Sequence, residues 1–135
     1  MSKNPIDMLK ARSEYEDQVA IFEWAALNEH RYPELKLLFG SLMGVRLPYK
    51  LLNKHKKAGM KKGKPDIHLP VARGGFIGLW IELKALGGRK PDDTQMEMLR
   101  LLNYYDHATY WRKGSDAAIK LIEEYLQGKI KKEKI

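Results

Sequence analysis

Two stretches decide the fold and the chemistry that this sequence predicts: Gly63-Lys64-Pro65-Asp66 and Trp80-Ile81-Glu82-Leu83-Lys84. The first places an acid directly after a Gly-Lys-Pro turn, and the second places an acid and a lysine on an apolar run. Two carboxylates with a lysine two residues after the second can hold a divalent cation and position a water molecule. This combination indicates phosphodiester hydrolysis.

The second stretch lies in the strongest strand signal of the chain, residues 76–85, where side chains alternate between two faces. Arg73-Gly74-Gly75 predicts a tight turn before it, so residues 67–71 form its antiparallel partner and end near Pro70. This pairing places Asp66 close to Glu82. One face of the long strand carries Ile77, Leu79, Ile81 and Leu83, and the other carries Phe76, Gly78, Trp80, Glu82 and Lys84.

Helix signals lie on both sides of this hairpin. Ser13 and Glu16 form a capping-box pattern at the start of a helix that fades near Arg31. A second helix begins at Pro48 and ends at Gly59, and Pro91 opens a third, with Asp92 and Asp93 favourable at its positive end. The apolar stripe that we expect on the first helix is Tyr15, Val19, Phe22 and Ala26, and Glu14 and Gln18 share a neighbouring stripe.

The remaining elements are shorter. We expect a strand over residues 35–39, a loop over residues 40–44, and a strand over residues 108–111 that follows a helical crossover and therefore runs parallel to the long strand. Ser115 is predicted to cap a last helix that Gly128 ends. Its predicted buried stripe is Ala118, Ile119, Ile122 and Leu126.

This order predicts one small α/β domain with a mixed β-sheet, a hairpin, a crossover helix and helices flanking the sheet. A length of 135 residues suits a single core, and 44% hydrophobic residues is ordinary for a globular protein. We divide the chain into an N-terminal arm (residues 1–12), a folded domain (13–127) and a frayed basic tail (128–135).

The amino-acid composition narrows the classes of molecule that we expect this protein to bind. The 25 lysines and arginines against 17 acids give a net charge of +8, which favours a polyanion, nucleic acid before an acidic membrane. The absence of cysteine excludes disulfides and thiolate metal sites and fits an intracellular setting. The first 15 residues have no apolar signal-peptide core, and no apolar run is long enough to cross a bilayer, so we expect no membrane partner.

The acidic residues fit Mg²⁺, which prefers hard oxygen ligands in octahedral geometry. Asp66 and Glu82 would supply carboxylates, and the backbone carbonyl of Leu83 a third oxygen. Lys84 would orient the water or neutralise charge on the phosphate. A simpler reading also exists for each fragment, because Pro-Asp is a common turn and Glu-x-Lys is a common solvated pair on a strand edge. Their position on one hairpin favours the metal site.

A basic stretch runs from Lys50 to Lys64, directly into Asp66. These lysines either solvate a helix or follow a DNA backbone, and we favour the second reading because positive charge beside a cleavage site attracts and orients DNA. The flexible loop Gly87-Gly88-Arg89-Lys90 adds further cations. The predicted DNA-binding residues are Lys54, Lys57, Lys61, Lys62, Lys64, Arg89 and Lys90.

The pattern Gly-Lys-Pro-Asp, hairpin, Ile-Glu-Leu-Lys resembles the PD-(D/E)xK nuclease superfamily. The whole chain from Ser13 to Leu126 is similar to one of its branches, the virus-type replication-repair nuclease (VRR-NUC) family. Three further stretches carry this narrower resemblance: Ser13-Glu14-Tyr15-Glu16-Asp17-Gln18, Leu69-Pro70-Val71-Ala72-Arg73-Gly74-Gly75-Phe76, and Gly87-Gly88-Arg89-Lys90-Pro91 leading to Gln95.

The resemblance implies a restriction-endonuclease-like core and a role for each matching position. It makes Asp66 and Glu82 metal ligands and Lys84 the catalytic lysine. It places Glu14 at the site through a metal-bound water or as a further ligand, and Gln95 on the crossover helix as site lining. Glu16 is an alternative to Glu14 that also fits the capping box. Gln18 is either site lining or a solvated helix position.

The same resemblance implies a Mg²⁺-dependent DNA endonuclease, with Mn²⁺ as a substitute, and no small-molecule organic cofactor. Family members from viruses and bacteria are associated with homodimers that act on branched DNA, including four-way junctions. The alternatives are a non-catalytic DNA-binding accessory protein with the same fold and an RNA-processing nuclease. His68 is a further lining residue or incidental, and we assign Trp24, Trp80 and Trp111 to the core or a dimer interface rather than to base stacking.

Overall fold

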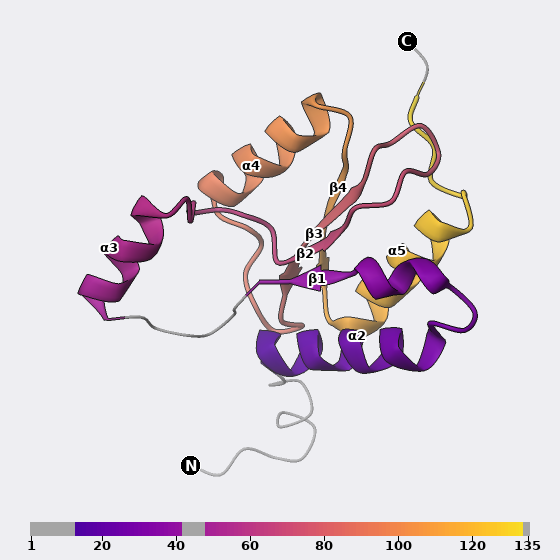
Figure 1. Cartoon of the computed structure of the whole chain (residues 1–135), viewed down its shortest axis with the longest axis horizontal. Coiled ribbons are helices and arrows are strands. Elements are labelled where there is room, and N and C mark those ends of the chain that lie inside the picture. Colours follow the sequence, from indigo (N-terminus) through magenta and orange to yellow (C-terminus); the bar gives the residue numbers. More distant parts are fainter. Residues whose placement is uncertain (1–12, 42–47, 134–135) are drawn as a thin grey trace.

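A four-stranded mixed sheet forms the centre of the fold (Figure 1), seen in a computed structural model that describes residues 13–41 and 48–133. The strand order is β1-β2-β3-β4, with β2 antiparallel to β1 and β3, and β4 parallel to β3. The mixed sheet, the hairpin and the parallel last strand are therefore confirmed. The strands are β1 (Phe39–Gly40), β2 (Ile67–Leu69), β3 (Leu79–Lys84) and β4 (Ala108–Lys113).

Helices flank both faces of this sheet. On one face, α2 and α5 pack over a core that includes Ile67, Ile81 and Leu83 of the sheet. On the other face, α4 forms the crossover from β3 to β4 and places Gln95 beside Glu82. The helices are α2 (Glu14–Asn28), the 3₁₀ helix η1 (Pro33–Leu37), α3 (Tyr49–Lys57), α4 (Asp93–Tyr104) and α5 (Ser115–Leu126).

Helix α2 begins as predicted but buries a different stripe. The Ser13 hydroxyl accepts a hydrogen bond from the Glu16 backbone N–H at 3.1 Å, which confirms the N-terminal cap. The expected stripe is wrong for Tyr15, Val19 and Ala26, which are exposed (61% and 37% for the first two), whereas Phe22 packs against the core as predicted. The buried positions of α2 are instead Asp17, Ile21 and Ala25.

The burial of Asp17 has a specific cause. Its Oδ1 accepts a hydrogen bond from the backbone N–H of Ser115 at 3.3 Å, so a carboxylate from α2 satisfies a free N–H in the first turn of α5. The prediction that Ser115 caps α5 is therefore wrong: Ser115 is the first helical residue, and Gly114 occupies the cap position with φ +81°. The predicted stripe on α5 is confirmed, with Ala118, Ile122 and Leu126 buried and Ile119 packed against the core.

Several predicted boundaries move. Residues 33–37 form a 3₁₀ helix with Pro33 in its first turn, so a strand over residues 35–39 is wrong and β1 is limited to Phe39–Gly40. The predicted loop over residues 40–44 includes Gly40, which belongs to β1, and residues 42–44 lie outside the described residues. Helix α4 begins at Asp93 rather than Pro91, because Asp92 caps it. Helix α3 follows Pro48 and ends before Gly59 as predicted.

The long strand also starts later than predicted, at Leu79. Arg73 and Phe76 bond to each other across a tight turn in which Gly74 and Gly75 have positive φ angles of +59° and +92°. This confirms the turn. Ile77 then bonds through its N–H to the carbonyl of Asp106 and leaves its side chain 55% exposed, so it lies outside the strand.

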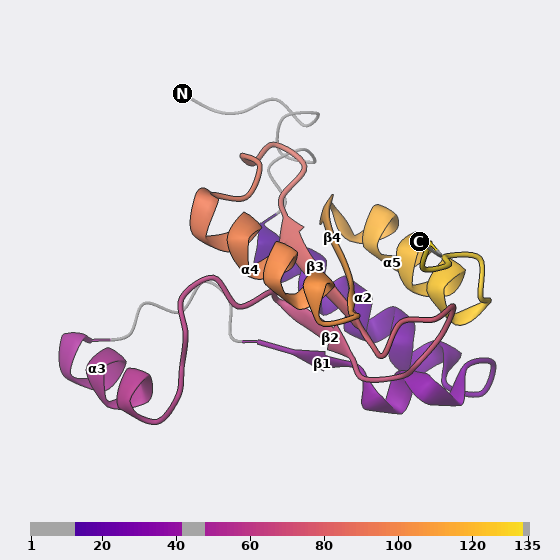
Figure 2. The same ribbon diagram turned by 90° about the horizontal axis from the view of Figure 1, so that it is seen from above.

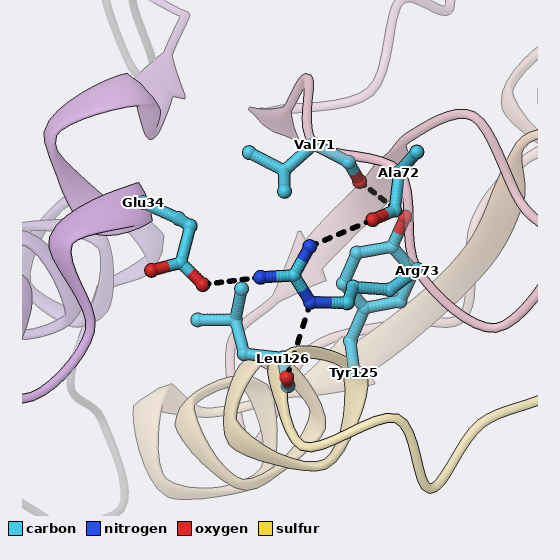
Figure 3. Close-up of polar contacts among 6 residues, drawn as sticks. All are labelled: Glu34, Val71, Ala72, Arg73, Tyr125 and Leu126. Carbon is cyan, nitrogen blue, oxygen red and sulfur yellow. Dashed lines mark hydrogen bonds and ion pairs between the residues drawn. The ribbon is translucent and has the colours of Figure 1, made fainter.

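Polar contacts centred on Arg73 hold the hairpin to the rest of the domain (Figure 3). Arg73 Nη2 lies 2.5 Å from Glu34 Oε2 in η1, and its Nε donates to the carbonyl of Leu126 in α5 at 3.3 Å. The Tyr125 hydroxyl donates to the Val71 carbonyl at 2.6 Å. We call Glu34, Arg73, Tyr125 and Leu126 the hairpin clamp.

The segment after α5 also lies against the hairpin. Ile130 packs partly buried against the core, and Lys132 donates its backbone N–H to the Gly74 carbonyl at 2.7 Å. A frayed tail is therefore wrong for residues 129–133, while Lys134–Ile135 and the predicted arm over residues 1–12 lie outside the described residues. No helix among those described is both long and apolar enough to span a membrane. The division into arm, domain and tail stays a prediction.

Candidate active site

The hairpin register brings the two predicted acids together. Ile67 of β2 pairs with Ile81 of β3, so Asp66, one residue before β2, lies beside Glu82. Asp66 Oδ2 accepts a hydrogen bond from the Leu83 backbone N–H at 2.8 Å, and the Asp66 carbonyl accepts one from the Ser41 N–H at 2.8 Å. Asp66 is thus held from both sides, and the convergence inferred from the sequence is confirmed.

Glu82 is almost fully buried, with 2% of its surface exposed. Its Oε1 accepts a hydrogen bond from Gln95 Nε2 at 2.9 Å and lies 3.6 Å from Lys84 Nζ. Its Oε2 is buried and receives no hydrogen-bond donor from the described part of the chain. A buried carboxylate oxygen without a donor is costly, and a bound proton or cation would offset that cost.

Both carboxyl groups bind protons more tightly than usual. Burial, then the charge and shared hydrogen bond of Asp66, raise the pKa of Glu82 to about 9, and the nearby Lys84 only partly offsets them. Burial likewise raises the pKa of Asp66, against the opposing effect of the Leu83 N–H. The charge of Glu14 raises the pKa of both. Near neutral pH the pair therefore retains a proton that a cation can replace.

Gln95 is fixed by the start of α4. Its backbone N–H donates to Asp92 Oδ1 at 2.8 Å, and its side-chain Oε1 accepts from the Asp92 N–H at 2.9 Å, which closes a capping box. The remaining Nε2 group then points to Glu82. The sequence predicted Gln95 near the site but missed this cap, although Asp-x-x-Gln before an apolar period is a capping-box signal.

The three residues of helix α2 that were considered for the site, Glu14, Glu16 and Gln18, differ in their contacts. Glu14 is half-buried and acts on the acid pair through its charge. Gln18 donates through Nε2 to the Ser41 carbonyl at 2.9 Å, so it supports the segment beside Asp66. Glu16 is exposed at the cap of α2, 3.1 Å from the Ser13 hydroxyl. Glu16 therefore contacts the N-cap residue Ser13 through both its backbone and its side chain.

The acid pair fits a small, hard cation. It offers carboxylate oxygens, one of them buried with no donor among the described residues, next to a lysine that limits the net negative charge. Across residues 13–41 and 48–133, no group of three or more His, Cys, Asp or Glu side chains is placed to hold a metal. A Mg²⁺ ion here would complete its coordination with backbone oxygen and water, which is usual for this ion.

The predicted basic residues lie on α3, in the segment after it and in the loop before α4. Helix α3 projects away from the sheet in both views (Figures 1 and 2), and the lysines on it and after it are exposed. Gly63, with φ +85°, lies against Thr94 in the first turn of α4. This contact brings the end of the lysine stretch close to Gln95 and to the loop that carries Arg89 and Lys90. The exposed cations are Lys54, Lys57, Lys61, Lys62, Lys64, Arg89 and Lys90.

His68 and Trp80 were not expected to act together. Their rings stack with centroids 3.6 Å apart and planes 7° from parallel. Both line a pocket that also includes Asp66, so His68 is a lining residue beside the acid pair. Trp24 packs against the core as predicted, whereas Trp80 lies outside the core cluster. Residues that face each other across two strands carry no local sequence signal of their contact.

Comparison with known proteins finds a similar solved structure but no matching family model or curated protein. A solved structure described as a "VRR_NUC domain protein" superposes with a TM-score of 0.74 at 26% identity, over 87% of this chain and 91% of that one. The chain has a VRR-NUC fold. The mixed sheet and its flanking helices match a restriction-endonuclease-like VRR-NUC architecture, and this fold is nuclease-like.

Proposed function

We propose that this VRR-NUC domain is a metal-dependent DNA endonuclease. The observation that supports this most strongly is the buried Glu82 beside Asp66 and Lys84, because Glu82 Oε2 receives no hydrogen bond from the residues that the structure describes. A buried carboxylate oxygen with no donor from the described protein groups is suited to a bound proton or a cation. The fold similarity to a VRR_NUC domain protein supports the same conclusion.

Each residue has a separate task in this proposal. Asp66, Glu82 and the Leu83 carbonyl would hold Mg²⁺ or Mn²⁺, and Glu14 would contribute at the same site through a water molecule or as a further ligand. When bound, the ion polarises the phosphoryl oxygen and lowers the pKa of a coordinated water. Lys84 stabilises negative charge that develops on the phosphate. Gln95 holds Glu82 in orientation through its bond to Oε1.

The substrate is DNA, and its backbone follows the cations near α3 and the start of α4. Helix α3 has no buried residue, and its last turn carries Lys54, Lys56 and Lys57. A helix with this composition gains little from packing and is suited to contact phosphates. We further propose branched DNA, including four-way junctions, as the substrate and a homodimer as the active form, because two-fold symmetry presents paired sites to a symmetric junction.

The test is a cleavage assay on labelled duplex, junction and RNA substrates with Mg²⁺, with Mn²⁺ and with chelator. Asp66→Ala and Glu82→Ala should each lower the cleavage rate at least about 100-fold, while DNA binding persists. The matched control is Glu97→Ala, which removes an exposed acid from α4, and this variant should cleave DNA at the wild-type rate.

Three results would contradict the proposal or its site assignment. Binding of DNA with no metal-dependent product would favour a non-catalytic accessory protein. Faster cleavage of RNA than of DNA would favour an RNA-processing nuclease. Cleavage by the Asp66 and Glu82 variants at the wild-type rate would remove the site assignment.

A further inference from the structure

A pocket of about 340 Å³ opens beside the acid pair. Its wall includes Asp66 itself, so any group that enters the pocket lies next to the proposed cleavage centre. The other lining residues are aromatic residues, one lysine, and the small residues glycine, serine and proline. They are Phe39, Gly40, Ser41, Lys64, Pro65, His68 and Trp80.

The strand register explains why the rings meet there. Phe39 pairs with His68, and His68 pairs with Trp80, so the three aromatic side chains form one row across β1, β2 and β3 on the same face. Glu82 lies two residues after Trp80 on β3, and Asp66 lies two residues before His68, just outside β2. Both acids are therefore on the same face of the sheet as the aromatic row. Two residues of strand span about 7 Å, so the aromatic row and the acid pair are close neighbours.

The rings of this row are held differently. Trp80 stacks on His68, and its Nε1 donates to His107 Nδ1 at 3.2 Å, so Trp80 is fixed by two partners. Phe39 lies on edge strand β1, where its side chain is 57% exposed. The pocket therefore offers a fixed aromatic wall, an exposed ring and the exposed Lys64 nearby.

We propose that this pocket receives one unpaired nucleobase of the DNA strand, from the nucleotide next to the phosphate that is cut. The inference rests on the proposed nuclease function and identifies a feature of its substrate. A base is flat and π-faced, which suits stacking against Phe39 and the His68–Trp80 pair. Lys64 would contact the phosphate attached to the same nucleotide, and a pocket of this volume is in the range that holds small ligands.

The proposal restricts the substrate. A base can enter the pocket only after it leaves its own stack and its partner base. That step costs a few kcal/mol in continuous duplex and least where the base is already unpaired. DNA with an unpaired nucleotide, as at a branch, a mismatch or a gap, should therefore bind better than the same sequence fully paired.

The test uses oligonucleotides with 2-aminopurine at successive positions, bound to the whole protein in the presence of chelator. Stacking on an aromatic ring quenches this fluorescent base. In wild-type protein, quenching should be greatest at one unpaired position. Phe39→Ala should reduce that quenching, with the His68–Trp80 pair still present, and weaken binding roughly 5- to 150-fold, the range that stacking of one base contributes. Tyr104→Ala, which removes a ring that is 77% exposed on α4, is the control and should change neither.

The outcomes separate this inference from the proposed function. Quenching that is equal at all positions, or unchanged in Phe39→Ala, would overturn the base pocket even if the protein cleaves DNA. Equal affinity for paired and unpaired substrates would also overturn it. Position-specific quenching that depends on Phe39, together with no cleavage when Mg²⁺ is added, would support the pocket and reject the nuclease.

Discussion

The hairpin clamp and the acid pair are two polar clusters on the same hairpin, and they differ in how completely they are satisfied. In the clamp, the Arg73 guanidinium has Glu34, Ala72 and Leu126 as acceptors, and the Tyr125 hydroxyl has Val71. In the acid pair, Glu82 has two partners for one oxygen and no donor for the other within the described residues.

The difference teaches where stability and function lie in this domain. The clamp joins η1, the hairpin and α5 with groups that complete one another, which is what a structural cluster requires. The acid pair keeps two carboxyl groups close together at raised pKa values, an arrangement that opposes folding unless a proton or a cation is bound. Proteins accept such local conflict mainly at functional sites. Each prediction below changes one side of this contrast.

The largest expected effect is on how the free energy of unfolding depends on pH. The pKa of Glu82 is about 9 in the folded chain and 4.5 as the ordinary value. Between these values the folded chain keeps a proton that the unfolded chain releases. The free energy of unfolding should therefore fall with rising pH, by up to about 1.4 kcal/mol per pH unit. Glu82→Gln should flatten this fall, as measured by urea unfolding in chelator from pH 5 to 8.

Two comparisons sharpen that measurement. Glu97→Gln makes the same change at an exposed acid on α4 and should leave the pH dependence as in wild type. Added Mg²⁺ should reduce the decline in wild type, because the ion takes the place of the proton. A wild-type curve that stays flat over this range in chelator would mean that the acid pair is not under electrostatic strain.

The next effect concerns the cations outside the acid pair. Replacing Lys54, Lys57 and Lys61 with alanine should reduce the slope of log K against log salt by roughly one unit per lost phosphate contact. Replacing Lys36, Lys120 and Lys129 removes the same charge from exposed positions away from α3, so this control should lower the slope much less. Equal slopes in the two triple variants, measured by DNA titration, would show that net charge alone attracts DNA.

The smallest effect is expected at the clamp. Arg73→Ala removes the contact with Glu34 and the bond to the Leu126 carbonyl, and should lower the free energy of unfolding by about 1–3 kcal/mol. Cleavage per folded molecule should not change. Arg31→Ala is the matched control: its ion pair with Glu123 spans 3.8 Å at a side chain that is 56% exposed, and its loss should cost less than about 1 kcal/mol. A larger loss of cleavage than of stability in Arg73→Ala would join the clamp to the active site.

The sequence predicted the acid pair because the hairpin is local. The alternation in the long strand, the glycine turn and Asp66 at the start of the partner strand together fix which residues face each other. The N-cap at Ser13 and the capping box at Asp92 are also local, since their partners lie three residues away, although the second of them was overlooked.

Contacts between distant segments could not be predicted in this way. The bond from Ser115 to Asp17 joins residues 98 positions apart, and nothing in the apolar period of α2 marks Asp17 as buried. The row of Phe39, His68 and Trp80 depends on the register of three strands, one of which is only two residues long. The short β1 was placed too early because Leu35 to Leu38 read as an apolar strand, whereas Pro33 begins a 3₁₀ turn there.

The central claim is that Asp66 and Glu82 together hold one divalent cation in place of a proton. Calorimetric titration of Mg²⁺ into wild-type protein at pH 8, in two buffers of different ionisation enthalpy, counts the protons released on binding. We expect about one proton per bound ion, and no detectable binding by Glu82→Gln. Binding of Mg²⁺ without proton release, or with equal affinity in Glu82→Gln, would contradict the claim.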